Sequence, residues 1–385
     1  MRAGRVLLAN CVERHRDDVD AYYECLRLAG GERGLAWDPS LEAWCVVSYD
    51  LCSWLLRSGG LTRRPISLLR SGDPDAVDEA EKILNSQFLF AEKKTAAVRR
   101  RYWTSVLLAG MKDEGYARLD HLADEALEAV PRGRRFDVYQ ELLQPFASRV
   151  AASCLGVPEE AREDLYPSIC AYVRFFDGKL TSVSDYHAAI RGIVCLFERL
   201  GSAHHPYGPP PGYPETQWVA DLVLTLVAGH ESTAYLLATI FRQLARPPGA
   251  NAVDGEVLRR LLAEALRFDS PIQLLSRRLN DDQTELLPSG CRGSDVYLHI
   301  GAANRDPAAF PDPASFSPTR AGPTPLSFGL GESRCPGRSV ATQAAFAFLR
   351  TLGRRREWLL VESAEVDHGV AARGLRALPG VRTAL

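Results

Sequence analysis

The segment FGLGESRCPGRSVA, from Phe328 to Ala341, places one cysteine in a glycine-rich run directly before a predicted helix. Cys335 is followed by Pro336 and Gly337, and residues 338–352 show the apolar spacing of a helix. A sulfur near a helix N-terminus meets unpaired N–H groups and the positive end of the helix dipole, and both favour the thiolate. The position therefore suits a thiolate that ligates a soft metal centre.

The small residues around this cysteine have their own physical reason. Gly329, Gly331 and Gly337 permit backbone conformations that other residues resist, and they let a flat ligand approach closely. Phe328 adds an aromatic face beside them. A lone cysteine in a glycine-rich loop is usually structural, but the spacing FxxGxxxCxGxxxA, complete from Phe328 to Ala341, is far more specific.

The composition of the chain is that of an ordinary globular protein. The 385 residues are 46% hydrophobic and 24% charged, and the net charge of −2 gives no reason to expect nucleic acid or a membrane surface as partner. The first apolar run, Val6–Ala9, is too short for a signal peptide, and no later run reaches bilayer length uninterrupted. We expect a cytoplasmic protein. Its nine scattered cysteines lack metal-finger spacing and are expected to be mostly buried.

The pattern of elements predicts a mainly α protein with small β-sheets, folded as one domain over residues 1–385. A strand is expected at Trp44–Ser48, and Asp50 is expected to cap a helix that runs to about Arg57. Residues from there to Lys94 look variable in conformation, and 201–214, with its two histidines, reads as an exposed loop. Short apolar pieces up to Pro325 suggest small sheets. Further helices are expected at about Thr95–Met111, Ala117–Val130, Gln140–Leu155, Asp185–Leu200, Trp218–Arg246, Glu256–Phe268 and Arg338–Leu352.

The cysteine segment resembles the haem-binding loop of the cytochrome P450 family, in its soluble bacterial form. The resemblance extends loosely over nearly the whole chain and is firmest between Trp218 and Ala341. It implies the single-domain P450 fold and a haem b (iron-protoporphyrin IX) cofactor. Cys335 would be the proximal thiolate ligand to the iron, with Phe328, Gly329 and Gly337 beside the haem.

A second segment, LVLTLVAGHESTAYLLATIF, resembles the family's helix across the distal face of the haem. Gly229, Glu231, Ser232 and Thr233 interrupt this otherwise apolar helix, and buried polar groups are costly unless they are paired or used. By resemblance, Glu231 is the acid and Ser232 the alcohol that deliver protons during oxygen activation. The family usually has Thr at the position of Ser232, and Thr233 could compensate for this difference. The alternative is a core helix whose hydroxyls bond back to its own carbonyls.

Charged residues supply further points of resemblance. Glu264 and Arg267 lie three residues apart on a predicted helix, and Arg320 stands where the family provides a second arginine to that glutamate. The resemblance implies a buried structural network of these three residues.

The haem propionates need cations. Arg277, with Arg278 as the fallback, falls where the family places a propionate-binding arginine, and Arg99 follows Thr95 by four residues on one helix face. Bacterial members often carry histidines at the positions of Thr95 and Ser333, so this chain departs from the family at both.

The resemblance also implies partners. No nucleotide-binding GxGxxG pattern follows a predicted strand, so electrons would come from a separate ferredoxin and its reductase. Lys93, Lys94 and Arg99–Arg101 allow two hypotheses. They form part of a basic face that docks an acidic electron-donor protein, or they are a solvated helix end with one arginine turned to a propionate.

The predicted activity is a monooxygenase that hydroxylates or epoxidises a small organic molecule in specialised-metabolite (antibiotic) biosynthesis. Residues 60–93 and 165–187 correspond to the family's specificity regions. They contain apolar residues that suit an organic ligand or are simply packed: Ile66, Leu68, Leu69, Phe88, Phe90, Phe175, Phe176 and Leu180. Alternatives are an atypical oxidation, such as radical C–C or C–N coupling or peroxide-driven turnover, and a haem sensor or carrier without catalysis.

Overall fold

The computed structural model describes residues 4–5, 18–58, 61–112, 115–178, 180–244, 255–279, 293–367 and 371–384. The chain forms two compact units, each assembled from separate segments of sequence. Unit 1 comprises Met1–Arg64, Ala263–Cys335 and Val370–Arg373, and unit 2 comprises Pro65–Leu262, Pro336–Gly369 and Gly374–Leu385. The prediction that residues 1–385 make a single domain stays a prediction.

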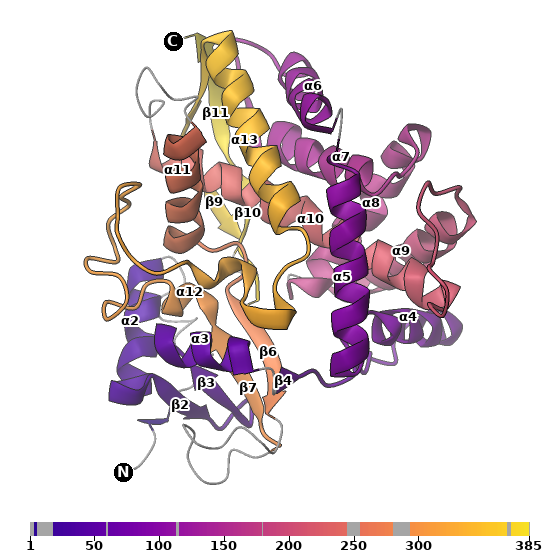
Figure 1. Ribbon diagram of the computed structural model, residues 1–385, viewed down its shortest axis with the longest axis vertical. Helices are drawn as coiled ribbons and strands as arrows, with labels where there is room; N and C mark the ends of the chain where they lie inside the picture. The colour runs from indigo at the N-terminus through magenta and orange to yellow at the C-terminus, as the bar shows by residue number, and fades with distance from the viewer. Residues whose placement is uncertain are drawn as a thin grey trace. The chain divides into compact units, whose positions relative to one another are not determined.

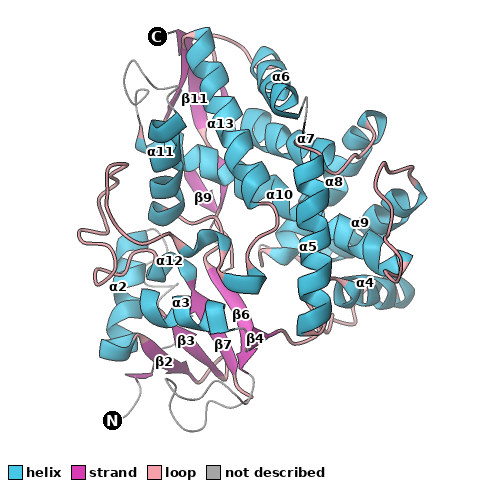
Figure 2. Ribbon diagram, in the orientation of Figure 1, coloured by secondary structure: helices cyan, strands magenta, loops and turns pink. Residues whose placement is uncertain are grey.

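Unit 1 is built on a mixed sheet with the strand order β1-β2-β3-β7-β6-β4. Strands β2 and β3 form an antiparallel hairpin, β3 runs parallel to β7, and β7 pairs antiparallel with β6. Figure 2 shows these strands beside short helices of the same unit. The strands are β1 (Gly4–Arg5), β2 (Leu35–Asp38), β3 (Ala43–Val46), β4 (Leu61–Thr62), β6 (Leu274–Leu279) and β7 (Asp295–His299), and the helices are α2 (Val19–Gly30), α3 (Tyr49–Ser58) and α12 (Ile300–Ala303).

The two faces of this sheet bury different sets of apolar side chains. Helix α2 packs Tyr23 and Leu26 in a cluster with Ala36 and Cys45. The other cluster joins Val46 to residues of α3, β7 and α12, with Phe310 and Leu326 from the segments that follow. The alternation of side chains along β3 explains why its neighbours Cys45 and Val46 enter different clusters.

The start of α3 corrects one prediction. The strand expected at Trp44–Ser48 is observed as β3, but Asp50 lies inside the first turn of α3 and is not its cap. The amide of Tyr49 instead donates to Asp306 Oδ2 at 2.8 Å. A carboxylate from a distant segment can satisfy a helix N-terminus as well as a local one, and local sequence does not show it.

Unit 2 contains most of the helices and two small sheets (Figure 1). Strands β5 (Arg135–Asp137), β11 (Pro379–Ala384) and β8 (Glu357–Val361) form one sheet, and β9 (Glu365–Asp367) pairs with β10 (Gly374–Ala377). Helix α11 (Gly255–Phe268) begins in this unit and ends in unit 1. The other helices are α4 (Pro74–Ser86), α5 (Lys93–Ala109), α6 (Gly115–Glu128), η2 (Val138–Leu143), α7 (Gln144–Cys154), α8 (Glu159–Phe176), α9 (Val183–Ser202), α10 (Glu215–Gln243) and α13 (Arg338–Arg355).

Helix α10 is the core helix of unit 2. It is long and apolar enough to cross a membrane, but 78% of its most apolar window is buried inside the protein. A helix that is apolar on all sides is expected in the interior of a large globular unit. Its predicted start at Trp218 lies three residues after the observed start, and the predicted end at Arg246 lies outside the described residues.

The prediction of a mainly α protein with small sheets is confirmed, but helices α2, α4 and α8 and the strands that follow α13 are among the elements not predicted. Helix α4 occupies the stretch expected to vary: Asp73 caps it and Pro74 stands in its first turn, a signal present in the sequence. Helix α8 was not predicted; it begins after Pro158 and contains Pro167. The strands that follow α13 were also missed, because they gain stability from pairing with β5 and with one another.

His299, the last residue of β7, is buried as a neutral ring in unit 1. Burial lowers the pKa of His299 from 6.5 to about 4, and the nearby Asp38 carboxylate only partly opposes this. Its Nε2 has no hydrogen-bond partner among the described residues. The folded chain therefore does not take up the proton that the unfolded chain binds below about pH 6.5.

We expect acid to destabilise the protein through His299. Between pH 7 and pH 5 the free energy of unfolding should fall by about 2 kcal/mol more in the unsubstituted protein than in His299→Leu. Only an unfolded chain that still carries His299 gains this proton. Urea denaturation of both proteins at the two pH values measures the difference. An equal pH dependence in both would contradict the assignment.

Candidate functional site

The cysteine segment of unit 1 forms two short turns before Cys335. The turns are η3 (Leu326–Phe328) and η4 (Gly331–Ser333), and the amide of Cys335 donates to the carbonyl oxygen of Phe328 at 2.8 Å. This bond closes the segment into a loop whose last residue, Cys335, is exposed. The predicted helix at Arg338–Leu352 is observed as α13, which begins three residues later in the chain.

Two glycines in the loop are required by its backbone. Gly329 and Gly331 have φ of +65° and +64°, a left-handed conformation that side chains resist. A Cβ on Gly331 would also lie 3.0 Å from the carbonyl oxygen of Leu56, at the end of α3. The structure thus gives both glycines local reasons, in addition to the expected approach of a flat ligand.

Asn304 connects this loop to the rest of unit 1. Its side-chain oxygen accepts the amide of Leu326 at 2.8 Å, and its Nδ2 donates to the hydroxyls of Ser327 and Ser270 at 3.0 and 2.7 Å. Both hydroxyls also donate to the carbonyl oxygen of Leu266 on α11. Asn304 is fully buried, and the sequence analysis did not single it out.

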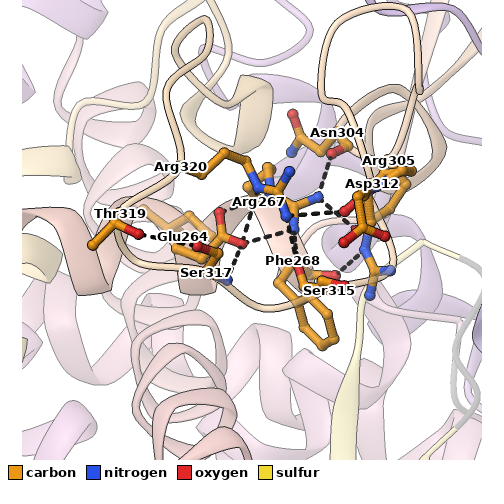
Figure 3. A network of polar contacts seen from close by, with 12 residues as sticks. Glu264, Arg267, Phe268, Asn304, Arg305, Asp312, Ser315, Ser317, Thr319 and Arg320 are labelled. Atoms are coloured by element: carbon orange, nitrogen blue, oxygen red, sulfur yellow. Dashed lines mark hydrogen bonds and ion pairs between the residues drawn. The ribbon is translucent and has the colours of Figure 1, made fainter. Parts of the chain in front are cut away.

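The predicted charge network is present in unit 1 (Figure 3). Arg267 binds both oxygens of Glu264 at 2.8 Å, and Arg320 Nε lies 3.3 Å from Glu264 Oε1. The side chains of Glu264 and Arg267 are almost fully buried. Arg267 also donates to the carbonyl oxygens of Asn304, Pro313 and Ser315, so its guanidinium organises the irregular chain after α12.

The acid and hydroxyl on α10 lie in its accessible stretch in unit 2. Residues 221–227 and 233–241 are all buried, whereas Ala228 is exposed and Gly229, Glu231 and Ser232 are partly exposed. The helix is unbroken here, and the Ser232 hydroxyl donates to the carbonyl oxygen of Ala228 at 2.8 Å. Ser232 therefore makes the back-bond of the alternative interpretation while remaining at the accessible stretch.

The neighbours of these residues show which of them serve helix packing and which could take part in a reaction. A Cβ on Gly229 would lie 3.0 Å from that of Ala151 on α7, so this glycine serves close helix packing. Thr233 is buried. Glu231 Oε1 accepts a hydrogen bond of 3.4 Å from the hydroxyl of Tyr139, a contact that the sequence analysis missed because 92 residues separate the two.

Comparison with known proteins agrees with this geometry. The family model described as cytochrome P450 matches residues 254–368. The beta-dihydromenaquinone-9 omega-hydroxylase of Mycobacterium tuberculosis is 36% identical over 299 residues, covering 69% of this chain and 58% of that protein. The biotin biosynthesis cytochrome P450 of Bacillus subtilis is 28% identical over 246 residues, covering 60% of this chain and 62% of that protein.

The chain belongs to the cytochrome P450 family. A crystal structure of P450BioI in complex with hexadec-9Z-enoic acid ligated acyl carrier protein matches with a TM-score of 0.80 and 23% identity, covering 96% of this chain and 99% of that one. This likeness confirms the predicted P450 fold. The chain spans less than two thirds of the length of the biotin and menaquinone relatives.

The residues present fit the family's cofactor, haem b. The donor expected of a P450 is a cysteine sulfur, and Cys335 offers one, exposed, at the end of a loop with two left-handed glycines. Phe328 and Gly329 are half-buried in the same loop, and Gly337 accepts the amide of Ala341 in the first turn of α13. The role of each residue toward haem stays a prediction.

The arginines predicted to bind the haem propionates differ in how many contacts they make with other residues of the chain. Arg277 is buried in β6 and donates through Nη1 to the carbonyl oxygen of Ser276 at 2.8 Å, while Arg278 is half-buried. Arg99 is engaged within unit 2, where Nη2 lies 2.7 Å from Asp221 Oδ2 and Nε donates to the Tyr213 hydroxyl at 3.0 Å.

Arg99 also donates to two backbone carbonyl oxygens, those of Ser86 and Gln217. These contacts favour a structural role for Arg99. A propionate role for Arg99, and for Thr95 in the exposed first turn of α5, stays a prediction.

The predicted basic docking face needs one correction. Arg99 is only 4% exposed and is paired with the buried Asp221, so it cannot present its charge to a partner protein. Lys93, Lys94 and Arg101 are exposed, and the guanidinium of Arg100 lies over the ring of Phe88 at 4.7 Å. The hypothesis is reduced to these four cations.

The two predicted specificity segments meet within unit 2. The hydroxyl of Tyr186 donates to the carbonyl oxygen of Leu69 at 2.6 Å, and Ser71 Oγ lies 3.1 Å from His187 Nε2. The predicted apolar residues divide between interior and surface, since Leu68 and Phe88 are buried and Leu69 is 72% exposed. The likeness of the segments to specificity regions stays a prediction, but their proximity is observed.

We expect removal of the buried arginine to be strongly destabilising. Arg267→Ala should lower the free energy of unfolding by about 3–5 kcal/mol, because it leaves Glu264 buried beside one remaining arginine. Arg259→Ala is the matched control on the same helix. It breaks only an exposed pair with Glu256 and should cost at most about 1 kcal/mol. Urea denaturation measures both, and equal costs would contradict a role for burial.

Proposed function

We propose that the protein is a haem-thiolate monooxygenase that oxidises a small organic molecule, using O2 and two electrons from a ferredoxin and its reductase. The observation that carries the proposal is the exposed Cys335 at the end of a closed, glycine-dependent loop. A purely structural cysteine of this chain is expected to be buried, as Cys45, Cys52 and Cys154 are. The proposal extends the family membership to an activity for this chain.

In this proposal the residues of the chain divide the work. Cys335 holds the haem, which when bound supplies the oxygen activation of the family. Glu231 and Ser232 hold and transfer protons from the accessible stretch of α10. The buried side chains before and after that stretch exclude water, which limits side reactions. Glu264, Arg267 and Arg320 keep the segment that precedes the cysteine loop in place.

The names of the relatives support a biosynthetic substrate. They include proteins of biotin biosynthesis and polyketide biosynthesis, both from Bacillus subtilis, and a hydroxylase of a menaquinone. We therefore propose that the substrate is a metabolite of a biosynthetic pathway and that the protein acts in the cytoplasm. A role in general detoxification is not proposed. One structural neighbour is bound to an acyl carrier protein with its fatty acid, so a substrate screen should include carrier-bound acyl chains beside free metabolites.

An atypical oxidation is the second candidate, and Ser232 favours it. The hydroxyl donates its proton to the carbonyl oxygen of Ala228, and serine lacks the methyl group that restrains the threonine rotamer. Looser proton delivery would favour radical coupling or peroxide-driven turnover. Product formation with hydrogen peroxide in place of the electron donors distinguishes this candidate from the first.

The thiolate assignment has a direct spectroscopic test. The reduced, CO-treated protein should show the red-shifted Soret band of thiolate-ligated haem, and Cys335→Ala should lose it because no sulfur remains to bind the iron. Cys195→Ala is the control and should keep the band. An unchanged spectrum in Cys335→Ala would exclude Cys335 as ligand.

The proton-delivery assignment is tested by coupling of electrons to product. Glu231→Ala should lower product formation by about 10²-fold while peroxide release rises, because a positioned acid is lost. Ser232→Ala should shift the ratio in the same direction and Ser232→Thr in the opposite one. Thr239→Ala removes an equivalent back-bond from a buried turn of α10 and should change little. Full coupling in both alanine variants of Glu231 and Ser232 would refute the pair.

A further inference from the structure

Tyr139 lies in an unusual stretch of backbone. It is the second residue of η2, a π-helical turn that runs from Val138 to Leu143 and continues directly into α7. Asp137 caps this turn, since its Oδ1 accepts the amides of Tyr139 and Gln140 at 2.9 and 3.0 Å. The wider turn changes the direction in which its side chains point, and such turns are frequent at functional sites.

The side chain of Tyr139 is fully buried, yet its hydroxyl reaches a carboxylate. It donates to Glu231 Oε1 at 3.4 Å, and both residues belong to unit 2. Burial, and then the negative charge of Glu231, hold the pKa of Tyr139 well above its usual value. The phenol therefore keeps its proton at any working pH and acts toward Glu231 as a donor.

Other proton-bearing groups surround the same carboxylate. The charge of Glu231 contributes to raising the pKa values of Tyr166 and Cys170 on α8, for which burial is the main cause. The charge of Asp177 also contributes to raising the pKa of Tyr139. The hydroxyl of Tyr139 makes a hydrogen bond to the carboxylate itself.

We propose that Tyr139 is a positioning residue for Glu231: the hydrogen bond from its hydroxyl to Oε1 fixes the rotamer of the carboxylate. Glu231 lies in the accessible stretch of α10 together with Ser232. The π-helical turn is the device that delivers the hydroxyl to this point from the start of α7. This inference deepens the proposed function and rests on it for the role of Glu231.

The central variant is Tyr139→Phe, which keeps the ring and deletes the hydroxyl. Haem content and the thiolate spectrum should be unchanged, while the share of electrons that reaches product should fall by about tenfold, the effect of losing an outer hydrogen bond to a working group. Peroxide release should rise correspondingly, because electrons that do not reach product leave as peroxide. Tyr23→Phe, which deletes a similar buried donor to Gln273 in unit 1, should move neither quantity.

A second measurement tests the contact without turnover. The urea midpoints of the resting, haem-loaded Tyr139→Phe, Glu231→Ala and double variants should be non-additive: the double variant should lose less than the sum of the two single losses. Additive midpoints, or coupling in Tyr139→Phe equal to that of the native protein, would overturn the inference. Loss of the thiolate spectrum in the native protein would instead overturn the proposed function, so the two failures are distinguishable.

Discussion

The fold of unit 1 depends on the desolvated guanidinium of Arg267. It is 1% exposed and binds Glu264 and three carbonyl oxygens from residues 304–315. A buried charge is tolerated only when its hydrogen bonds are satisfied, so the irregular chain around it has little freedom. The carbonyl oxygen of Asn304 accepts one of these hydrogen bonds, and its side chain binds the amide of Leu326 and the hydroxyl of Ser327. The carbonyl oxygen of Phe328 then accepts the amide of Cys335. The cysteine loop is thus held by polar contacts.

Two carboxylates of helix α10, those of Asp221 and Glu231, lie in contrasting surroundings. Asp221 is fully buried, and burial raises its pKa although Arg99 lies beside it. It also accepts the amide of Phe88 at 2.6 Å, so it holds the chain before α5 in place. Glu231 is ten residues further along and partly exposed, with a neutral phenol as a hydrogen-bond donor. The first carboxylate is used for structure, and the second is the one that we propose transfers protons.

The successes and failures of sequence reasoning have physical causes. Helices with a sustained apolar period, such as α9 and α10, were predicted within three residues at their starts, because burial of one face depends mainly on local spacing. Helix α4 was missed although Asp73 and Pro74 mark its start. The capping of α3 by Asp306 could not be predicted from the sequence, since Asp306 lies 257 residues from Tyr49, whose amide it accepts. For Arg99 the motif showed a cation on a helix but not the buried acid that neutralises it.

The sequence by itself determined the family, through the glycine and cysteine spacing of residues 328–341, and the members of the buried network of Glu264, Arg267 and Arg320. These are features in which residue type is dictated by backbone conformation or by charge. Only the tertiary structure decided which carbonyl oxygens Arg267 binds, that Arg99 is enclosed by Asp221, and that Tyr139 reaches Glu231. Those contacts join segments far apart in the chain, and a buried polar atom is satisfied by whichever partner the packing brings within hydrogen-bond distance.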